Sequence, residues 1–412
     1  MDVSVVRALA APEGQELLRS LPPYDDSSVL TLQNRLRSAG HAPELAAAAL
    51  TQQRLRARAT AKFGEFAADM LFTPDGLEQA TRLEVAVAHA HRFSRASLAT
   101  VHDLGCGIGA DSVTLSSLGV TVRGVDSDPV TAAVADANLR PWPDSRARLG
   151  RAEDVRFGVD PGRNRVGAWL DPARRTRGVA DVNGRTRRTF RLDDISPSWA
   201  FVQEVAAAVP ATGVKLSPGF DHAAIPAGTE AQWTSWAGDV VECALWWGPL
   251  VMRRGRTARV MGPDTAPVVV DESMAEPVPR LAGSLDDVGP WLHDVDKAVI
   301  RAGLVGAVTR ATGGMESDEG TGYVLASRDV SLPYTRRYAV HEAMPFTVKT
   351  LRSWLRTNGV TGLTIKKRGV RLDDEQLRRD LRIGAKAGDG EQATVVLTRV
   401  GGSPVALVVS PA

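Results

Sequence analysis

The chain has little cysteine and no apolar stretch long enough to cross a membrane. Cys106 and Cys243 are the only cysteines among 412 residues, too few for a disulfide framework or, by themselves, for a zinc site. The first residues lack the basic region and apolar core of a secretory leader, and no apolar run approaches the roughly 20 residues of a membrane span. These absences predict a cytoplasmic protein with no membrane partner.

An excess of charge of one sign is also missing, because 50 basic residues stand against 48 acidic ones. The distribution is uneven, however. Residues 148–191 hold twelve arginines against five acidic residues, and residues 336–382 hold twelve lysines and arginines against five. Such stretches attract a polyanion such as RNA. A solvated basic face is the other interpretation, and charge alone does not choose between them.

What the chain does have is a glycine-rich turn between a buried strand and a helix, in VHDLGCGIGAD (101–111). Gly105 and Gly107 let the backbone turn tightly and approach a ligand that side chains would block. A second strand, Val120–Val125, ends at Asp126, 21 residues after Gly105. A carboxylate at that strand tip, followed by Ser127, is placed to accept hydrogen bonds from two ribose hydroxyls. The two pieces predict a nucleoside-binding βαβ unit.

Two cofactor classes fit this turn. Gly105, Gly107 and Ala110 satisfy the dinucleotide pattern G-x-G-x-x-G/A, so a nicotinamide-dependent dehydrogenase stays open on glycines alone. Asp103, two residues before the first glycine, instead suits a cationic cofactor. S-adenosylmethionine (SAM) carries an ammonium and a sulfonium, so carboxylates near its amino-acid end are favourable. The stretch resembles motifs I and II of class I SAM-dependent methyltransferases.

Strands and helices alternate from residue 98 to residue 255, which calls for a parallel, doubly wound sheet with ligands at the strand C-terminal ends. Strands are predicted over Thr100–Leu104, Val120–Val125, Ala147–Arg151, Val166–Leu170, Thr212–Leu216 and Val240–Trp246. The residues before them read as mostly helical, with an amphipathic helix over Pro43–Phe63. We therefore predict an α/β fold: a helical N-terminal lobe (1–82), a Rossmann-like methyltransferase domain (83–258) and a C-terminal α+β domain (259–412).

Further candidate site residues follow the third and fourth strands. Glu153 and Asp154 offer a carboxylate to an adenine amino group. The fourth strand runs into Asp171-Pro172-Ala173-Arg174, in the place of motif IV, which faces the acceptor atom in methyltransferases. Enzymes that methylate exocyclic base nitrogens tend to show [DN]PP[YFW], and Ala173 departs from that pattern. Arg174 offers bidentate donors to a phosphate, or is simply solvated at a strand end.

The turn after the fifth strand, VKLSPGFDH (214–222), carries polar residues on the expected cofactor side. They include Lys215 and Ser217, and His222 beside Asp221 is a candidate general base. A structural role for that histidine is the alternative.

The C-terminal domain carries no catalytic constellation. Its predicted helices are Asp294–Leu304, Thr347–Thr357 and Asp373–Ile383, and its predicted strands are Val360–Lys367, Thr394–Val400 and Pro404–Val409. A linker or strand pair over Arg256–Asp287 precedes them. Its basic side chains suit contacts with a nucleic-acid backbone; they are Arg352, Arg356, Lys366, Lys367, Arg368, Arg378, Arg379 and Arg382.

These segments together resemble a bacterial family of class I SAM-dependent methyltransferases with a C-terminal THUMP-like domain. The resembling pieces are GLEQATR (76–82), DLGCGIGAD (103–111), GVDSDP (124–129), LDPARR (170–175), VKLSPGFDH (214–222), AMPFTVKTLRSWL (343–355) and LTIKKRGV (363–370). The resemblance implies SAM contacts at Asp103, Gly105, Gly107 and Asp126, and at Gln79 or Thr81. The catalytic part is also distantly similar to trimethylguanosine synthases, which act on RNA caps. THUMP domains bind RNA, so the resemblance implies an RNA substrate.

We therefore predict a SAM-dependent methyltransferase acting on RNA, either tRNA or rRNA. Asp171 would orient the acceptor or take its proton, with Pro172 and Arg174 beside it, and catalysis would rest on proximity and alignment. One alternative keeps the chemistry and changes the acceptor to a small molecule or a protein. A second is a SAM- and RNA-binding protein that no longer transfers a methyl group. A dehydrogenase is third, and NAD binding would favour it.

Overall fold

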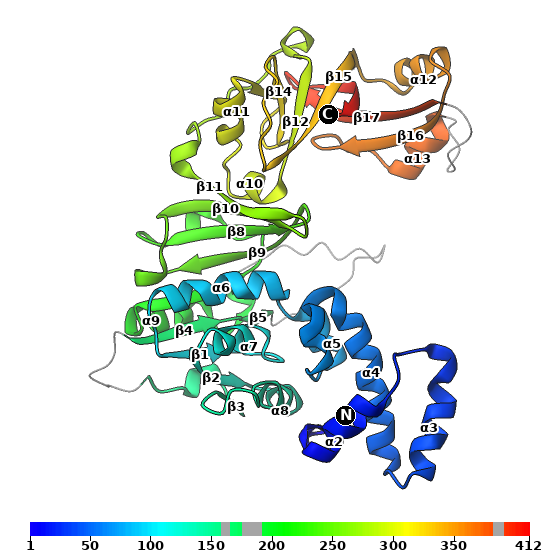
Figure 1. The fold of residues 1–412 in the computed structure, drawn as a ribbon. Coiled ribbons are helices and arrows are strands. Elements are labelled where there is room, and N and C mark those ends of the chain that lie inside the picture. Colours follow the sequence, from blue (N-terminus) through cyan, green and yellow to red (C-terminus); the bar gives the residue numbers. More distant parts are fainter. Residues whose placement is uncertain (158–164, 175–191, 382–390) are drawn as a thin grey trace. The chain divides into compact units, whose positions relative to one another are not determined.

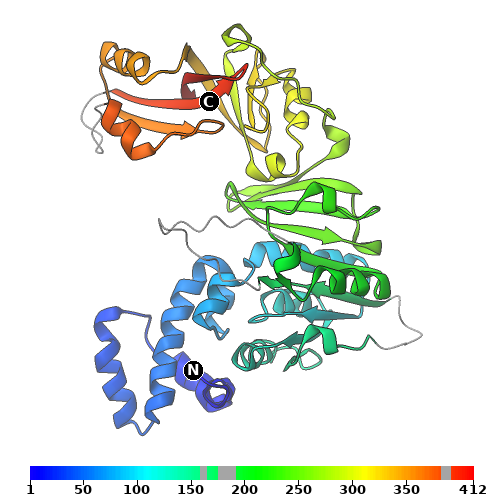
Figure 2. The same cartoon turned by 180° about the vertical axis from the view of Figure 1, so that it is seen from behind.

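The computed structural model describes residues 1–157, 165–174, 192–381 and 391–412, and the chain divides into two units. The first contains Met1–Leu216 with Leu245–Met252, and the second contains Ser217–Ala244 with Arg253–Ala412. Figures 1 and 2 show the ribbon from opposite sides. The division into three domains stays a prediction.

The N-terminal part of the first unit is helical, as predicted. Its helices are α1 (Val3–Ala10), α2 (Pro12–Ser20), α3 (Val29–Ser38), α4 (Pro43–Phe63), α5 (Pro74–Gln79) and α6 (Leu83–Arg95). Helix α4 begins with proline in its first turn, where no backbone donor is needed, and ends just before Gly64, whose φ is 54°. Phe63 packs against Phe72 with ring centroids 5.5 Å apart. This apolar core continues to Ile108 and Val134, so the helical part packs onto the turn before α7 and onto α8 of the α/β part that follows it.

A parallel sheet in the first unit brings the predicted site residues to one edge. Its strands are β1 (Thr100–Leu104), β2 (Thr121–Asp126), β3 (Arg146–Leu149), β4 (Val166–Leu170) and β7 (Ala211–Leu216), in the order β7-β4-β1-β2-β3. All four neighbouring pairs are parallel. Helices α7 (Ala110–Ser117), α8 (Pro129–Asn138) and α9 (Trp199–Ala208) connect them. The predicted Rossmann-like α/β architecture is confirmed.

The central strands are apolar because both faces of the sheet are covered. Val101, Leu104 and Ala168 are all fully buried. Trp169 on β4 stacks on Trp246, which belongs to the same unit, with ring centroids 5.2 Å apart. These contacts place the start of the glycine turn and the end of β4 on a rigid base.

The second unit contains two groups of strands. The first group is β8 (Glu230–Trp236), β9 (Asp239–Trp246, whose last two residues belong to the first unit), β10 (Gly255–Gly262) and β11 (Thr265–Asp271), in the order β11-β10-β8-β9. The second group is a seven-stranded sheet in the order β13-β14-β12-β15-β18-β17-β16. Its strands are β12 (Trp291–Val295), β13 (Met315–Glu316), β14 (Tyr323–Ala326), β15 (Thr335–Pro345), β16 (Val360–Lys367), β17 (Glu391–Val400) and β18 (Ser403–Pro411). The helices of the second unit are α10 (Lys297–Arg301), α11 (Gly306–Thr312), α12 (Val348–Thr357) and α13 (Asp374–Leu381).

Two sequence interpretations in this unit are settled by the strand pairing. The predicted helix over Asp294–Leu304 is wrong at its start, because Asp294 and Val295 end strand β12. Helix α10 begins only after Asp296, whose carboxylate accepts a hydrogen bond from the Ala298 amide at 2.8 Å and caps the helix. Of the two interpretations of residues 256–287, the strand pair is right, since β10 and β11 pair antiparallel.

Candidate cofactor and acceptor site

The glycine-rich turn joins the end of β1 to helix α7. Gly105 has a φ of 90° and Gly107 a φ of 56°, in the left-handed region that residues with a side chain rarely adopt. A Cβ on Gly105 would also lie 3.1 Å from the backbone carbonyl oxygen of Asp171. The glycine turn is therefore held directly against the turn that follows β4, where the acceptor is predicted to lie.

Asp126 at the tip of β2 braces this turn from the neighbouring strand. Its Oδ2 accepts from the Gly107 amide at 3.0 Å, and its Oδ1 accepts from the Asp128 amide at 2.9 Å. Burial raises the pKa of Asp126, and these backbone donors oppose that rise. The carboxylate is half-buried and Ser127 beside it is exposed. Both therefore lie at a strand end that a ligand can reach.

Asp103 on β1 carries a buried carboxylate with an unsatisfied oxygen. The residue is 1% exposed. Its Oδ2 accepts from the Ser112 hydroxyl at 2.5 Å, while its buried Oδ1 has no hydrogen-bond partner. Burial raises the pKa of Asp103 to about 8, and the nearby Asp111 charge adds to the rise. A buried oxygen without a donor is costly, so the site fits a ligand that supplies one, as the ammonium of SAM would.

Asp103 should make the stability of the protein depend on pH. Its folded pKa of about 8 exceeds the ordinary value of 3.8. Between these values the folded chain holds a proton that the unfolded chain has released, so the free energy of unfolding should fall as pH rises from 4 to 8. Asp103→Asn should remove this part of the decline. Urea denaturation at pH 5 and pH 8 measures it, and an undiminished decline in the variant would contradict the assignment.

Lys215, Asp171 and Thr81 meet at the carboxyl ends of β7 and β4. The Lys215 ammonium lies 2.5 Å from Oδ2 of Asp171 and donates to the Thr81 hydroxyl at 3.1 Å. The Lys215 side chain is 17% exposed and that of Asp171 33%. Thr81 itself is buried and follows helix α5. The turn after β4 is therefore tied to the loop before α6.

A second buried pair continues this chain of contacts. Nδ1 of His89 on α6 lies 2.8 Å from Oδ1 of Asp111 on α7, and the Thr81 side chain helps to lower the pKa of the same carboxylate. The His89 ring packs against Trp169, with centroids 4.6 Å apart. Burial acts to raise the pKa of Asp111, but the hydrogen bond from His89, the His89 charge and Lys215 hold it below its usual value. Asp111 is thus ionised, and it pairs with His89 between α6 and α7.

The remaining predicted site residues are more loosely placed. Gln79 is exposed at the end of α5, and Asp154 is exposed in the turn after β3. Glu153 is half-buried in that turn and accepts from Arg151 at 3.4 Å. Pro172 is half-buried between β4 and the short strand β5 (Ala173–Arg174). The side chain of Arg174 lies outside the described residues. The SAM contacts and catalytic roles of all these residues stay predictions.

Sequence reasoning gave no role to Asp111, His89 or Lys62. Lys62 on α4 donates to the carbonyl oxygens of Leu77 and Glu78, both at 2.9 Å, and so holds the end of α5. Burial lowers the pKa of Lys62 to about 8, and the charge of Lys215 adds to the shift. These contacts join residues far apart in the sequence, and no local spacing signals them.

The turn after β7 does not pair His222, the candidate general base, with Asp221. The Asp221 carboxylate accepts from the Ala223 amide at 3.0 Å, and Nε2 of His222 lies 2.7 Å from the Arg301 carbonyl oxygen. Each side chain is thus engaged elsewhere, which favours the structural alternative for His222.

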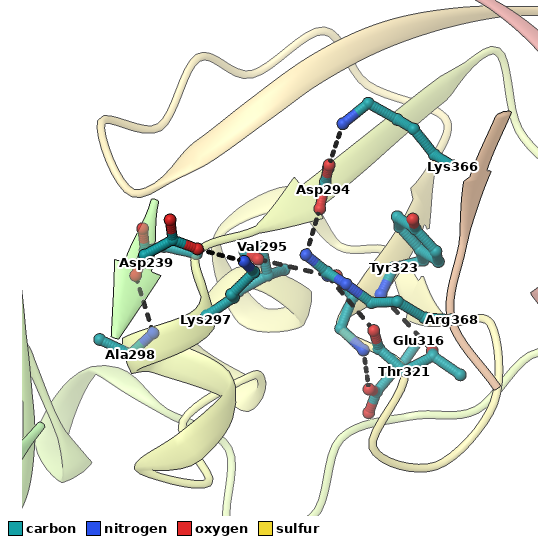
Figure 3. A network of polar contacts seen from close by, with 12 residues as sticks. Asp239, Asp294, Val295, Lys297, Ala298, Glu316, Thr321, Tyr323, Lys366 and Arg368 are labelled. Carbon is teal, nitrogen blue, oxygen red and sulfur yellow. Dashed lines mark hydrogen bonds and ion pairs between the residues drawn. The ribbon is translucent and has the colours of Figure 1, made fainter. Parts of the chain in front are cut away.

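Several cations predicted to contact nucleic acid are bound within the second unit instead. Lys366 and Arg368 both pair with the buried carboxylate of Asp294, at 2.9 and 2.7 Å, as Figure 3 shows. Arg368 also lies over the Tyr323 ring, 4.9 Å from its centroid, and Lys367 pairs with Asp374 at 2.6 Å. These contacts connect the C-terminal end of β16 to β12, β14 and α13. Arg382 lies outside the described residues.

Neither a metal centre nor a membrane span is found in the described part of the chain. It holds no group of three or more His, Cys, Asp or Glu side chains arranged to bind a metal ion, and Cys106 and Cys243 are buried free thiols. In the same residues no helix is long and apolar enough to cross a membrane.

Comparisons with known proteins give one family at each end and relatives over most of the chain. Residues 335–411 match the THUMP domain-like family, and residues 2–59 match a domain of unknown function, DUF8688. Two proteins of Mycobacterium tuberculosis, from strains CDC 1551 / Oshkosh and ATCC 25618 / H37Rv, are named as uncharacterised S-adenosylmethionine-dependent methyltransferases. Each is 32% identical over 357 residues, which is 84% of this chain and 91% of the relative. A crystal structure assigned as a methyltransferase of Porphyromonas gingivalis W83 shares the fold, with a TM-score of 0.70 and 18% identity over 95% of this chain and all of that one.

Proposed function

The chain belongs to the family of S-adenosylmethionine-dependent methyltransferases, with SAM as its methyl donor, and on that premise we propose that its acceptor is RNA, either tRNA or rRNA. The observation that carries the proposal is the THUMP-like domain at residues 335–411 of the same chain, because THUMP domains bind RNA. Such a substrate would place the enzyme in the cytoplasm.

The residues at the strand ends suit the proposed cofactor site. The orphaned Oδ1 of Asp103 would accept from the ammonium of SAM, and Asp126 would accept from the ribose hydroxyls. Glu153 or Asp154 would bind the adenine amino group, and Gln79 would close the site from α5. When bound, SAM supplies an electrophilic methyl group on its sulfonium.

The acceptor would lie at the turn after β4. Asp171 is one-third exposed there, so its carboxylate can meet an incoming substrate. In this proposal Asp171 orients the acceptor, Pro172 shapes the turn and Arg174 contacts a substrate phosphate. The rate enhancement then comes from alignment of donor and acceptor.

The second unit would hold the RNA backbone through its exposed cations. Because Lys366 and Arg368 are paired with Asp294, the candidates are the exposed side chains Arg336, Lys349, Arg356 and Arg371. Each phosphate that such a side chain neutralises adds affinity that falls with salt.

Incubation with methyl-labelled SAM and fractionated RNA from a strain lacking the gene tests the proposal. Label should enter one tRNA or rRNA fraction, and nucleoside analysis would identify the atom. The variant Arg356→Glu/Arg371→Glu should raise the KM for that RNA about tenfold without changing SAM affinity, and more strongly at low salt.

Other outcomes of this experiment separate the alternatives. If no RNA fraction is labelled, protein and small-molecule fractions of the same strain are offered in place of RNA. Label in one of these, with the charge-reversed variant fully active, would replace RNA as the acceptor. SAM binding without label in any fraction would favour a silent binding protein, an outcome consistent with Ala173 standing in motif IV.

A further inference from the structure

We propose that Lys215 is a positioning residue of the methyl-transfer site, which fixes the Asp171 carboxylate and restricts it to accepting a hydrogen bond from the substrate. The inference rests on the proposed acceptor-facing role of Asp171, but it does not require the acceptor to be RNA.

The sheet register brings the two side chains together. Strands β4 and β7 are parallel neighbours in which Leu170 is level with Val214. Asp171 directly follows the last residue of β4, and Lys215 is the next residue on β7, so they leave the sheet side by side at its carboxyl edge. The ammonium then lies 2.5 Å from Oδ2 of Asp171. The pairing is thus a consequence of strand order rather than of loop conformation.

Lys215 is also held by a segment outside the sheet, the loop before α6. Its ammonium also donates to the Thr81 hydroxyl at 3.1 Å. Thr81 acts in turn on the Asp111 carboxylate, which pairs with His89. Asp111 and His89 are both buried. A lysine with partners on two separate segments loses much of its freedom, so that Asp171 is fixed by a rigid neighbour.

The charge of Lys215 decides which role Asp171 can take. An ammonium in direct contact stabilises the ionised carboxylate and makes it a weaker base. A weak base is poorly suited to remove a proton from the acceptor, whereas an ionised carboxylate accepts a strong hydrogen bond from an N–H or O–H group. Of the two roles predicted for Asp171, orientation of the acceptor is therefore favoured over proton removal.

A pair of variants separates charge from packing. Lys215→Met removes the ammonium and keeps most of the side-chain length, whereas Lys215→Arg keeps a positive charge. The matched control is Lys297→Met, which removes an exposed lysine that pairs with Asp239 at 2.6 Å in the second unit. Thermal denaturation of all three variants verifies that they are folded.

The first readout is the affinity for SAM relative to S-adenosylhomocysteine, whose sulfur is uncharged, and it needs no acceptor. Loss of a cation beside the reacting centre should favour the charged ligand, so Lys215→Met should shift the ratio of dissociation constants several-fold toward SAM. Lys215→Arg and Lys297→Met should leave the ratio unchanged. An unchanged ratio in Lys215→Met, or an equal loss of both ligands, would overturn the proposal.

The second readout is methyl transfer to the acceptor fraction found above, as a function of pH. Lys215→Met should lower kcat about 100-fold with a KM for SAM within about threefold, Lys215→Arg should recover at least tenfold of that loss, and Lys297→Met should match the unaltered protein. Removal of the ammonium should also move the acid limb of the kcat profile to higher pH. An unaltered rate and profile in Lys215→Met would contradict the inference. If no fraction is labelled by the unaltered protein, the acceptor proposal fails while the affinity ratio still tests Lys215.

Discussion

Asp126→Ala is expected to weaken SAM binding by at least about 100-fold in a calorimetric titration. A hydrogen bond to an ionised group contributes about 1.5–3 kcal/mol, and each 1.4 kcal/mol is about tenfold in affinity. Two ribose hydroxyls without an acceptor therefore account for the expected loss. The variant also removes the acceptor of the Gly107 amide, so the turn that receives the cofactor would be less well held.

The neighbouring aspartate provides a matched control for this prediction. Asp128 is exposed, and its Oδ1 accepts from the Thr131 amide at 2.7 Å, capping helix α8. Asp128→Ala should cost about 1 kcal/mol of unfolding free energy and leave SAM affinity within about twofold. Unchanged affinity in Asp126→Ala, or an equal loss in Asp128→Ala, would show that the ribose site has been misplaced.

Sequence analysis predicted the bounds of an element best where that element's own residues identify it. The bounds predicted for Pro43–Phe63, Thr100–Leu104 and Val166–Leu170 coincide with α4, β1 and β4. A proline start with a glycine stop marks the helix, and short apolar runs mark strands buried on both faces. The glycine turn was equally visible, because Gly105 and Gly107 adopt backbone angles that other residues avoid.

The parts that sequence reasoning missed depend on partners far away in the chain. Strand β15 was not predicted: within it only Tyr338 and Met344 are buried, so no regular alternation marks it, and it is stabilised by pairing with β12 and β18. The ion pairs that Lys366 and Arg368 form with Asp294 were also missed, because Asp294 lies more than 70 residues earlier in the chain. From the sequence, the run Lys366-Lys367-Arg368 was interpreted only as a nucleic-acid contact.

The candidate acceptor site is a second example of contacts that the sequence alone does not reveal. The sequence placed Asp171 and Lys215 at strand ends, and only the strand order β7-β4-β1 makes them neighbours. Propensity and spacing act along the chain, whereas strand order is decided by packing of the whole sheet.

Asp171→Asn is expected to lower methyl transfer by about 100-fold or more while the protein stays folded and binds S-adenosylhomocysteine normally. The amide keeps the shape of the side chain but loses the negative charge that pairs with Lys215. We propose that this charge also accepts a strong hydrogen bond from the substrate. Removal of a negative charge beside the reacting centre should also weaken SAM relative to S-adenosylhomocysteine several-fold, the opposite of the shift expected for Lys215→Met.

The two opposite shifts make a double-mutant cycle decisive for Asp171. In Asp171→Asn/Lys215→Met the pair is electrically neutral again, so the ratio of the two affinities should return to within about twofold of its original value. Methyl transfer should remain low in the double variant, because neither change restores a carboxylate toward the acceptor. Recovery of transfer would mean that Asp171 serves only to neutralise Lys215. A low rate with a restored affinity ratio would separate its electrostatic role toward the cofactor from its orienting role toward the acceptor, which a single substitution cannot do.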